Sequence, residues 1–222
     1  LLIQRGHDLN IWAYARIDTV DRELLDRMKK AGINWICYGI ESANQRVRDD
    51  VTKGRFDLDN IREVIRETRV AGINVLGNFL FGLPEDDMDS MQETLGLAFD
   101  LNCEYVNFYT AMAYPGSGLY QDVRSQGIRL PDTWKGFGQY SPDTVPLPTR
   151  YLAAEEVLEF RDRAFERYFS RPGYLNMIRD KFGEETVIHI KQMMQHKLIR
   201  NLLKEHEAQF QKRWEQYSRN AE

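Results

Sequence analysis

The sequence has little cysteine, no long apolar run and no excess of positive charge, and each absence narrows what the chain can be. Its two cysteines, Cys37 and Cys103, are too few to predict a disulfide framework. No apolar stretch is long enough to span a bilayer, and the first residues lack the pattern of a signal peptide. The net charge of -4 argues against a nucleic-acid-binding surface spread over the whole molecule. We therefore expect a cytoplasmic protein with no transmembrane segment and no nucleic-acid partner.

Short runs rich in β-branched and aromatic residues predict four buried strands. Each run is followed by a helical pattern, and two of the helices end at a glycine, Gly32 and Gly72, within the repeated sequence Ala-Gly-Ile-Asn. Strands that alternate with helices predict a parallel sheet with right-handed crossovers. Four such units do not close an eight-stranded barrel, so the sheet is either open or part of a larger barrel. The predicted strands are residues 9–17, 34–40, 74–83 and 104–114.

The last third of the chain has a different pattern. Residues 129–150 hold most of the seven prolines and predict an extended connector. Helical periodicity follows, first over 153–169 and later in a long C-terminal run that predicts one bent helix or two helices. We therefore predict three regions, namely an α/β region over 1–128, the connector over 129–150 and an all-helical region over 151–222.

The residues that follow each predicted strand are candidate site residues, because parallel sheets bind ligands at the carboxyl ends of their strands. The forked guanidinium of Arg16 can bind a carboxylate, and Glu41 with Ser42 can bind sugar hydroxyls. Glycines at the third and fourth strand ends let a flat ring approach the backbone. The candidate binding residues are Arg16, Glu41, Ser42, Gly82, Leu83, Pro84, Glu85, Tyr114, Pro115 and Gly116.

Each strand end also has a purely structural interpretation. Arg16 can simply pair with Asp18, and Glu41 can cap the helix that follows it. The third and fourth strand ends can be turns and nothing more, with Asp86 or Asp87 capping the helix after the third strand. The recurrence of polar or glycine-rich residues at four successive strand ends favours a binding site over four separate coincidences.

The motifs "RID", "GIES", "AGI", "FGLPED" and "YPGSGLY", in this order, resemble the second half of a radical SAM core domain. The resemblance covers about residues 8–122. The most similar class often follows a cobalamin-binding domain and includes anaerobic oxidative cyclases and methyltransferases. The resemblance implies an α/β fold, a partial (β/α) barrel whose four strands correspond to the third to sixth strands of the six-stranded radical SAM barrel.

The resemblance also implies roles for the strand ends. Arg16 would bind the methionine carboxylate of S-adenosylmethionine, and Glu41 with Ser42 would bind its ribose or amino-acid part. Residues 82–85 would lie against the adenine, although Glu85 stands where the family often has a second glycine. Residues 114–118 would close the pocket.

The family's cluster motif, three cysteines spaced Cys-x3-Cys-x2-Cys, is absent. We therefore expect a piece of a longer enzyme without the cluster-binding part, which has no catalytic residue, no metal ligand and no activity of its own. For the intact enzyme the resemblance implies S-adenosylmethionine and a [4Fe–4S] cluster, with cobalamin left open, acting on a small-molecule substrate.

Two other functions stay open at this point. One is a non-catalytic helical interaction module on a degenerate half-barrel, which the C-terminal helices and the missing cysteines favour. The other is an ordinary barrel aldolase or lyase, but the strand ends show neither the lysine nor the metal triad that such an enzyme needs. An open sheet edge or the C-terminal helices could also pair with a second copy to form a homodimer.

Overall fold

The computed structural model of the protein describes residues 1–49 and 57–204. The chain forms two compact units. The first unit contains Leu1–Phe79 and Glu93–Phe108, and the second contains Leu80–Gln92 and the chain from Tyr109 onward. The division at residues 128 and 150 that the sequence predicts stays a prediction. No helix in the described part of the chain is long and apolar enough to cross a membrane.

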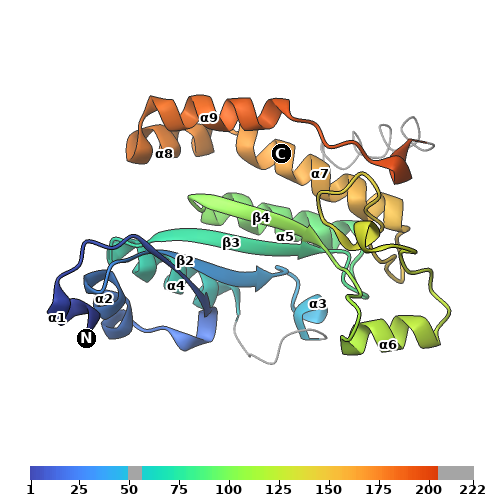
Figure 1. Ribbon diagram of the computed structural model, residues 1–222, viewed down its shortest axis with the longest axis horizontal. Helices are drawn as coiled ribbons and strands as arrows, with labels where there is room; N and C mark the ends of the chain where they lie inside the picture. The colour runs from blue at the N-terminus through green and yellow to red at the C-terminus, as the bar shows by residue number, and fades with distance from the viewer. Residues whose placement is uncertain (50–56, 205–222) are drawn as a thin grey trace. The chain divides into compact units, whose positions relative to one another are not determined.

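Four strands form one sheet in the order β1-β2-β3-β4, so neighbours in the sheet are also neighbours in the sequence (Figure 1). β1 pairs with β2, and β2 with β3, in parallel. This pairing confirms the predicted parallel sheet. Helical crossovers join the successive strands, as a parallel arrangement requires. The bounds are β1 Ile11–Arg16, β2 Ile33–Glu41, β3 Asn74–Phe81 and β4 Tyr105–Thr110.

Two of the helices between the strands, α2 and α4, end just before the predicted glycines, and each begins at an aspartate. Asp21 caps α2, accepting a hydrogen bond from the Leu24 N–H at 2.8 Å, and Asp57 caps α4 in the same way. Gly32 has a φ of 91°, and a Cβ there would lie 2.8 Å from the Leu9 Cβ, so glycine is needed to end this helix. The bounds are α1 Leu2–Arg5, η1 Ile17–Thr19, α2 Arg22–Lys30, α3 Gln45–Asp49, α4 Leu58–Val70 and α5 Met88–Leu101.

The core of the first unit lies on the side of β2 that faces α2 and α4. Ile36, Tyr38 and Ile40 are fully buried, and α2 contacts both β2 and α4. The Tyr38 hydroxyl and the Thr68 hydroxyl of α4 share a hydrogen bond of 2.8 Å, which satisfies both buried polar groups. Burying each large apolar side chain contributes about 2 kcal/mol, so these residues hold the carboxyl ends of β1 and β2 on a stable base.

The second unit is mostly helical after the predicted connector. Residues 129–150 contain one 3-10 helix, η2 Trp134–Phe137, and no strand or α-helix. The three helices α7 to α9 contact one another, and the rings of Tyr168, Phe169 and Tyr174 pack with centroids 5.0 to 5.2 Å apart. The bounds are α6 Gly118–Ser125, α7 Ala154–Ser170, α8 Pro172–Phe182, α9 Glu184–Gln195 and η3 Asn201–Leu203.

The long C-terminal helical run ends earlier than its periodicity predicts. α9 ends at Gln195 because His196 adopts an extended backbone with a ψ of 93°. Only η3 follows before Lys204, so the described part of the run is one α-helix and a short turn. The remainder of the predicted helix, residues 205–222, lies outside the described residues.

Candidate cofactor-binding site

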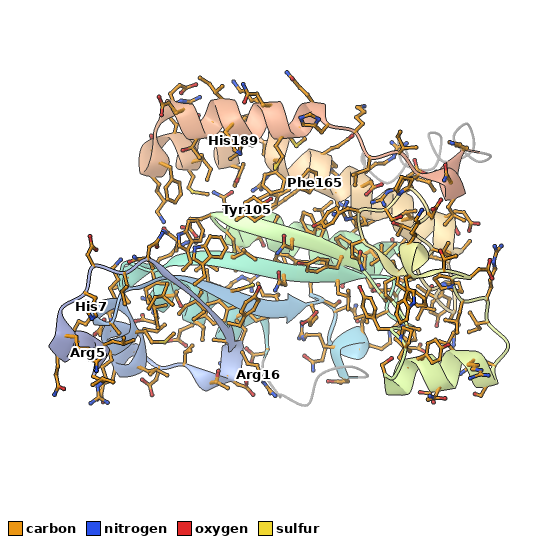
Figure 2. The ribbon with its side chains drawn as sticks, viewed as in Figure 1. Arg5, His7, Arg16, Tyr105, Phe165 and His189 are labelled. Atoms are coloured by element: carbon orange, nitrogen blue, oxygen red, sulfur yellow. The ribbon has the colours of Figure 1, made fainter. Side chains whose placement is uncertain are left out.

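The carboxyl ends of β1 and β2 bring a guanidinium and a carboxylate to the same face of the sheet. Arg16, the last residue of β1, is paired with Gly39 of β2, and paired residues in a parallel sheet point to the same face. A Cβ on Gly39 would lie 2.7 Å from the Glu41 Oε1, so the Glu41 side chain folds back over Gly39 on that face. Figure 2 shows Arg16 at the end of its strand. The first two predicted strand ends therefore do converge.

Glu41 is held in an unusual backbone conformation. Its φ is 63°, in the left-handed region, and the pairing of β2 with β3 shifts register between Gly39 and Glu41. This conformation is about 1 to 2 kcal/mol unfavourable for a non-glycine residue, so the surrounding contacts must stabilise the backbone of Glu41. Burial raises the pKa of the Glu41 carboxyl, and within the described residues that carboxyl has no hydrogen bond or ion pair. A half-buried carboxylate that no described residue binds is suited to bind a ligand's hydroxyls or ammonium group.

Arg16 forms the ion pair that its structural interpretation predicts. Its Nε donates to Asp18 Oδ1 at 2.9 Å, and its Nη2 donates to Asp18 Oδ2 at 2.7 Å. This bidentate pair engages only one side of the guanidinium, and the side chain is 54% exposed. The Nη1 side has no partner among the described residues. Asp18 therefore fixes the orientation of the guanidinium and leaves its outer edge available to an anion.

Ser42 is fully buried, and its side chain is engaged within the protein. Its hydroxyl shares a hydrogen bond of 3.1 Å with the Thr94 hydroxyl and accepts the N–H of Asn44 at 3.2 Å. Asn44, and not Glu41, accepts an N–H in the first turn of α3, that of Val47 at 3.4 Å. The structure thus assigns Ser42 to the bend itself, and its predicted contact with a ligand stays a prediction.

In the second unit, the loop after β3 is a tight, well-supported turn. Gly82 has a φ of 79°, and a Cβ there would lie 2.4 Å from the Val157 Cγ1 of α7. Glu85 pairs with Arg150 at 3.2 Å, and the Arg150 N–H donates to the Pro84 carbonyl at 3.0 Å. Arg150 of the connector therefore stabilises this loop. Gly82 cannot carry a side chain without displacing α7.

Asp86 stabilises the same loop from inside. It accepts the Leu83 N–H at 2.9 Å and the Ser90 hydroxyl at 2.6 Å, and burial raises the pKa of its carboxyl in spite of these bonds. Asp87 is the residue that caps α5, accepting the Ser90 N–H at 2.8 Å. Of the two predicted caps, Asp87 is therefore confirmed.

The loop after β4 is exposed at its centre. Tyr114 is 48% exposed, and Pro115 and Gly116 are exposed as well. Ser117 caps α6 by accepting the Tyr120 N–H at 3.1 Å, and its hydroxyl donates to the Tyr114 carbonyl at 2.7 Å. These contacts explain the turn without a ligand, and the ligand contacts predicted for residues 114–116 stay predictions.

The cysteines do not fit an iron–sulfur cluster. Cys37 and Cys103 are the only cysteines of the chain, and both are free and buried. Burial raises the pKa of the Cys103 thiol to about 12, so the thiolate that a metal requires is strongly disfavoured there. No group of three His, Cys, Asp or Glu side chains that could hold a metal ion occurs among residues 1–49 and 57–204.

Replacing Glu41 by glutamine is expected to stabilise the protein at neutral pH. Because the folded state raises the pKa of this carboxyl, its ionisation opposes folding. Below the ordinary glutamate pKa, about 4.3, both states hold the proton and the two proteins should be equally stable. The advantage of Glu41→Gln should grow as the pH rises through that value and be complete above the folded-state pKa.

Urea unfolding of both proteins between pH 3.5 and 8 measures this difference. Glu23→Gln is the matched control, since Glu23 lies on the exposed surface of α2 with an 82% exposed side chain. A stability difference for Glu41→Gln that does not change with pH, or that changes in the same way for Glu23→Gln, would show that Glu41 is not a strained carboxyl.

Comparison with known proteins identifies the relatives of this chain. Residues 13–98 match the model of the radical SAM superfamily. An uncharacterized methyltransferase of Pyrococcus horikoshii is 25% identical over 185 residues, which are 83% of this chain and 39% of the relative. An anaerobic magnesium-protoporphyrin IX monomethyl ester cyclase of Cereibacter sphaeroides is 27% identical over 68% of this chain and 24% of its own length. The chain thus spans less than half of these relatives, and the resemblance to radical SAM enzymes is confirmed.

Solved structures support the same fold. The radical S-adenosylmethionine methyltransferase TsrM from Kitasatospora setae, solved with cobalamin and a [4Fe–4S] cluster bound, has a TM-score of 0.51 at 19% identity, over 58% of this chain and 26% of TsrM. The archaeal Elp3 from Methanocaldococcus infernus has a TM-score of 0.52 at 14% identity, over 75% of this chain and 34% of Elp3. At this identity the likeness shows the fold alone, and it confirms the predicted partial α/β barrel.

Proposed function

We propose that this chain, whose residues 13–98 match the radical SAM superfamily, is the S-adenosylmethionine-binding part of a radical SAM methyltransferase or cyclase. The observation that carries the proposal is the placement of Arg16 and Glu41 on one face of the sheet, at the carboxyl ends of neighbouring strands. This is the end of a parallel sheet at which ligands bind. The names of the methyltransferase and cyclase relatives support the reaction class.

The two side chains suit the amino-acid end of S-adenosylmethionine. That end carries a carboxylate and an ammonium group, and the ribose beside it carries two hydroxyls. The Nη1 edge of the Arg16 guanidinium, which Asp18 orients, would bind the carboxylate. Glu41 would accept hydrogen bonds from the ammonium group or the ribose, and neighbouring strands lie about 5 Å apart, within the reach of one such ligand. When bound, S-adenosylmethionine supplies the group that is transferred or the source of the radical, and these residues bind and orient it.

The chain on its own is proposed to be inactive. A [4Fe–4S] cluster of the family's type needs three closely spaced thiolates, and this sequence has two separated cysteines. The cluster, any cobalamin and most of the substrate contacts would then belong to other parts of the complete enzyme, whose substrate is a small molecule. The roles of residues 82–85 toward the adenine and of residues 114–116 stay predictions, as does a homodimer.

Replacing Arg16 by methionine is expected to weaken the binding of S-adenosylhomocysteine to the 222-residue chain at least tenfold. A hydrogen bond to a charged group contributes about 1.5 to 3 kcal/mol, which corresponds to roughly a tenfold to hundredfold change in the dissociation constant. Isothermal titration calorimetry of the wild-type and variant chains measures the effect.

Arg22→Met is the matched control for this experiment. Arg22 is also a partly exposed arginine of the first unit in an ion pair, in its case with Asp26 and Glu67. It is the first residue of α2, and its guanidinium binds both of these carboxylates, so its replacement should leave binding unchanged. If the two variants bind equally, Arg16 has no role in binding. If the wild-type chain does not bind the ligand at all, the proposal fails and the non-catalytic helical module becomes the better account.

A further inference from the structure

Two buried side chains outside the sequence motif fasten the bend that follows Glu41. They are Thr94 of α5 and Arg48 of α3, both in the first unit. We infer that Thr94 and Arg48 are positioning residues, which hold the Glu41 carboxyl folded back over Gly39, next to the end of β1 that carries Arg16. The inference rests on the proposed function only for the role of the Glu41 carboxyl in ligand binding. The hydrogen bonds that fix the bend are present whatever that role is.

Thr94 binds the bend from its N–H side. Its Oγ1 accepts the Ala43 N–H at 3.0 Å and shares a hydrogen bond of 3.1 Å with the Ser42 hydroxyl. Both Thr94 and Ser42 are fully buried, so neither hydroxyl can exchange its partner for water. Loss of the Thr94 hydroxyl would leave the Ala43 N–H without this partner in a dry environment.

Arg48 binds the same bend from its carbonyl side. Its Nη1 donates to the Ser42 carbonyl at 2.8 Å and to the Ala43 carbonyl at 2.7 Å, and its Nη2 donates to the Gln45 side chain. The residue is 2% exposed, and burial lowers the pKa of its guanidinium. Burying a charge carries a large free-energy penalty, so an arginine is an unfavourable residue to place beside this buried bend unless its hydrogen bonds compensate. A guanidinium is, however, the group whose rigid fork can bind two successive carbonyls.

The two side chains act on Glu41 through the backbone. Ser42 and Ala43 are bound on both sides, and Glu41 directly precedes them in a left-handed conformation that is unfavourable for glutamate. If the bend relaxes, Glu41 can return to an extended conformation. In an extended strand the Glu41 side chain would stand upright from the sheet, on the same face as position 39, so its carboxyl would no longer fold back over Gly39.

Thr94→Val tests the inference, with Thr94→Ser as the control. Valine keeps the shape of threonine and removes the hydroxyl, whereas serine keeps the hydroxyl. The first measurement is the titration of the Glu41 carboxyl in the full 222-residue chain, followed by carbon NMR. We expect the pKa of Glu41 to fall toward its ordinary value in Thr94→Val and to stay at its wild-type value in Thr94→Ser. Wild-type behaviour of the Glu41 titration in Thr94→Val would overturn the inference, whether or not the chain binds a ligand.

The second measurement is the affinity for S-adenosylhomocysteine. Thr94→Val should weaken binding about tenfold, and Thr94→Ser should bind within about twofold of the wild type, as expected for one buried hydrogen-bonding group. A wild-type chain that binds and a Thr94→Val chain that binds equally well would contradict the positioning role and leave the proposed function intact. If Thr94→Val does not fold, Ser42→Ala, which removes the other hydroxyl of the pair, takes its place in both measurements.

Discussion

Replacing Arg200 by methionine should destabilise the second unit by about 3 to 5 kcal/mol, the range observed when one partner of a buried ion pair is removed. The Arg200 side chain is 3% exposed and forms a bidentate pair with Asp162 of α7, at 2.7 and 2.9 Å. The same guanidinium donates to the carbonyls of Gln139 and Ser141 and to the Thr144 hydroxyl. One side chain therefore ties the segment after α9 to both α7 and the connector.

The loss of stability should be large because the groups that Arg200 binds would remain in place without their donor. Methionine has nearly the length of the aliphatic part of arginine but no donor, so three acceptors on the connector, among them the buried Thr144 hydroxyl, would lose a partner at once. The Gln139 side chain binds both the N–H and the carbonyl of Thr110 at the end of β4, so loosening the connector would also release the end of that strand. Urea unfolding measures the change in the free energy of unfolding. An unchanged dependence of that free energy on urea concentration would show that both variants unfold in the same transition.

Arg179→Met is the matched control for Arg200→Met. Arg179 also lies in the second unit and pairs with Glu184, but its side chain is 42% exposed. An exposed ion pair contributes less than about 1 kcal/mol, so this variant should remain close to the wild type. Equal effects of the two substitutions would show that the buried network around Arg200 does not stabilise the unit as its geometry indicates.

Gly82→Ala should destabilise the second unit by about 2 to 4 kcal/mol, because two unfavourable terms coincide at this position. The backbone has a φ of 79°, and the new methyl group would lie 2.4 Å from the Val157 Cγ1. The methyl group cannot be accommodated unless α7 moves, and Val157 is fully buried there. Thermal and urea unfolding measure the loss.

Gly127→Ala separates the cost of the backbone conformation from the cost of the steric clash. Gly127 has a similar φ of 67°, but nothing lies within 4 Å of a Cβ built there. Its replacement should therefore show the backbone term alone, about 1 kcal/mol. A Gly82→Ala variant that loses no more than Gly127→Ala would mean that α7 adjusts freely and that the loop after β3 is less constrained than its packing indicates.

The elements of the fold were predictable because their signals are local. Strand periodicity, the Asp87 cap and the terminal glycines Gly32 and Gly72 all lie within a few residues of the structure that they specify. The length of the C-terminal helix was not predictable in this way. Nothing in its apolar periodicity shows that the backbone becomes extended at His196, after which Arg200 binds residues about sixty positions earlier in the chain.

The candidate site was predictable only in part, for the same reason. Motif residues identify Arg16 and Glu41, and the resemblance gives them roles. That Glu41 folds back over Gly39 depends on a register shift between strands, which no local pattern encodes. Thr94 was missed because it lies 51 positions from Ala43 in the sequence, in the middle of a helix with an ordinary amphipathic pattern. The hydrogen bonds of the Ser42 hydroxyl within the bend could not be predicted from the motif, and its ligand contact stays a prediction.

The central claim is that the carboxyl ends of β1 and β2 bind the amino-acid end of S-adenosylmethionine. The most direct measurement is a titration of the isotopically labelled chain with S-adenosylhomocysteine, followed by the NMR signals of individual residues. We predict that the signals of Arg16, Gly39 and Glu41 shift together and saturate with one dissociation constant, while those of α2 do not move. Saturable shifts confined to other residues, or none at millimolar ligand, would contradict the account.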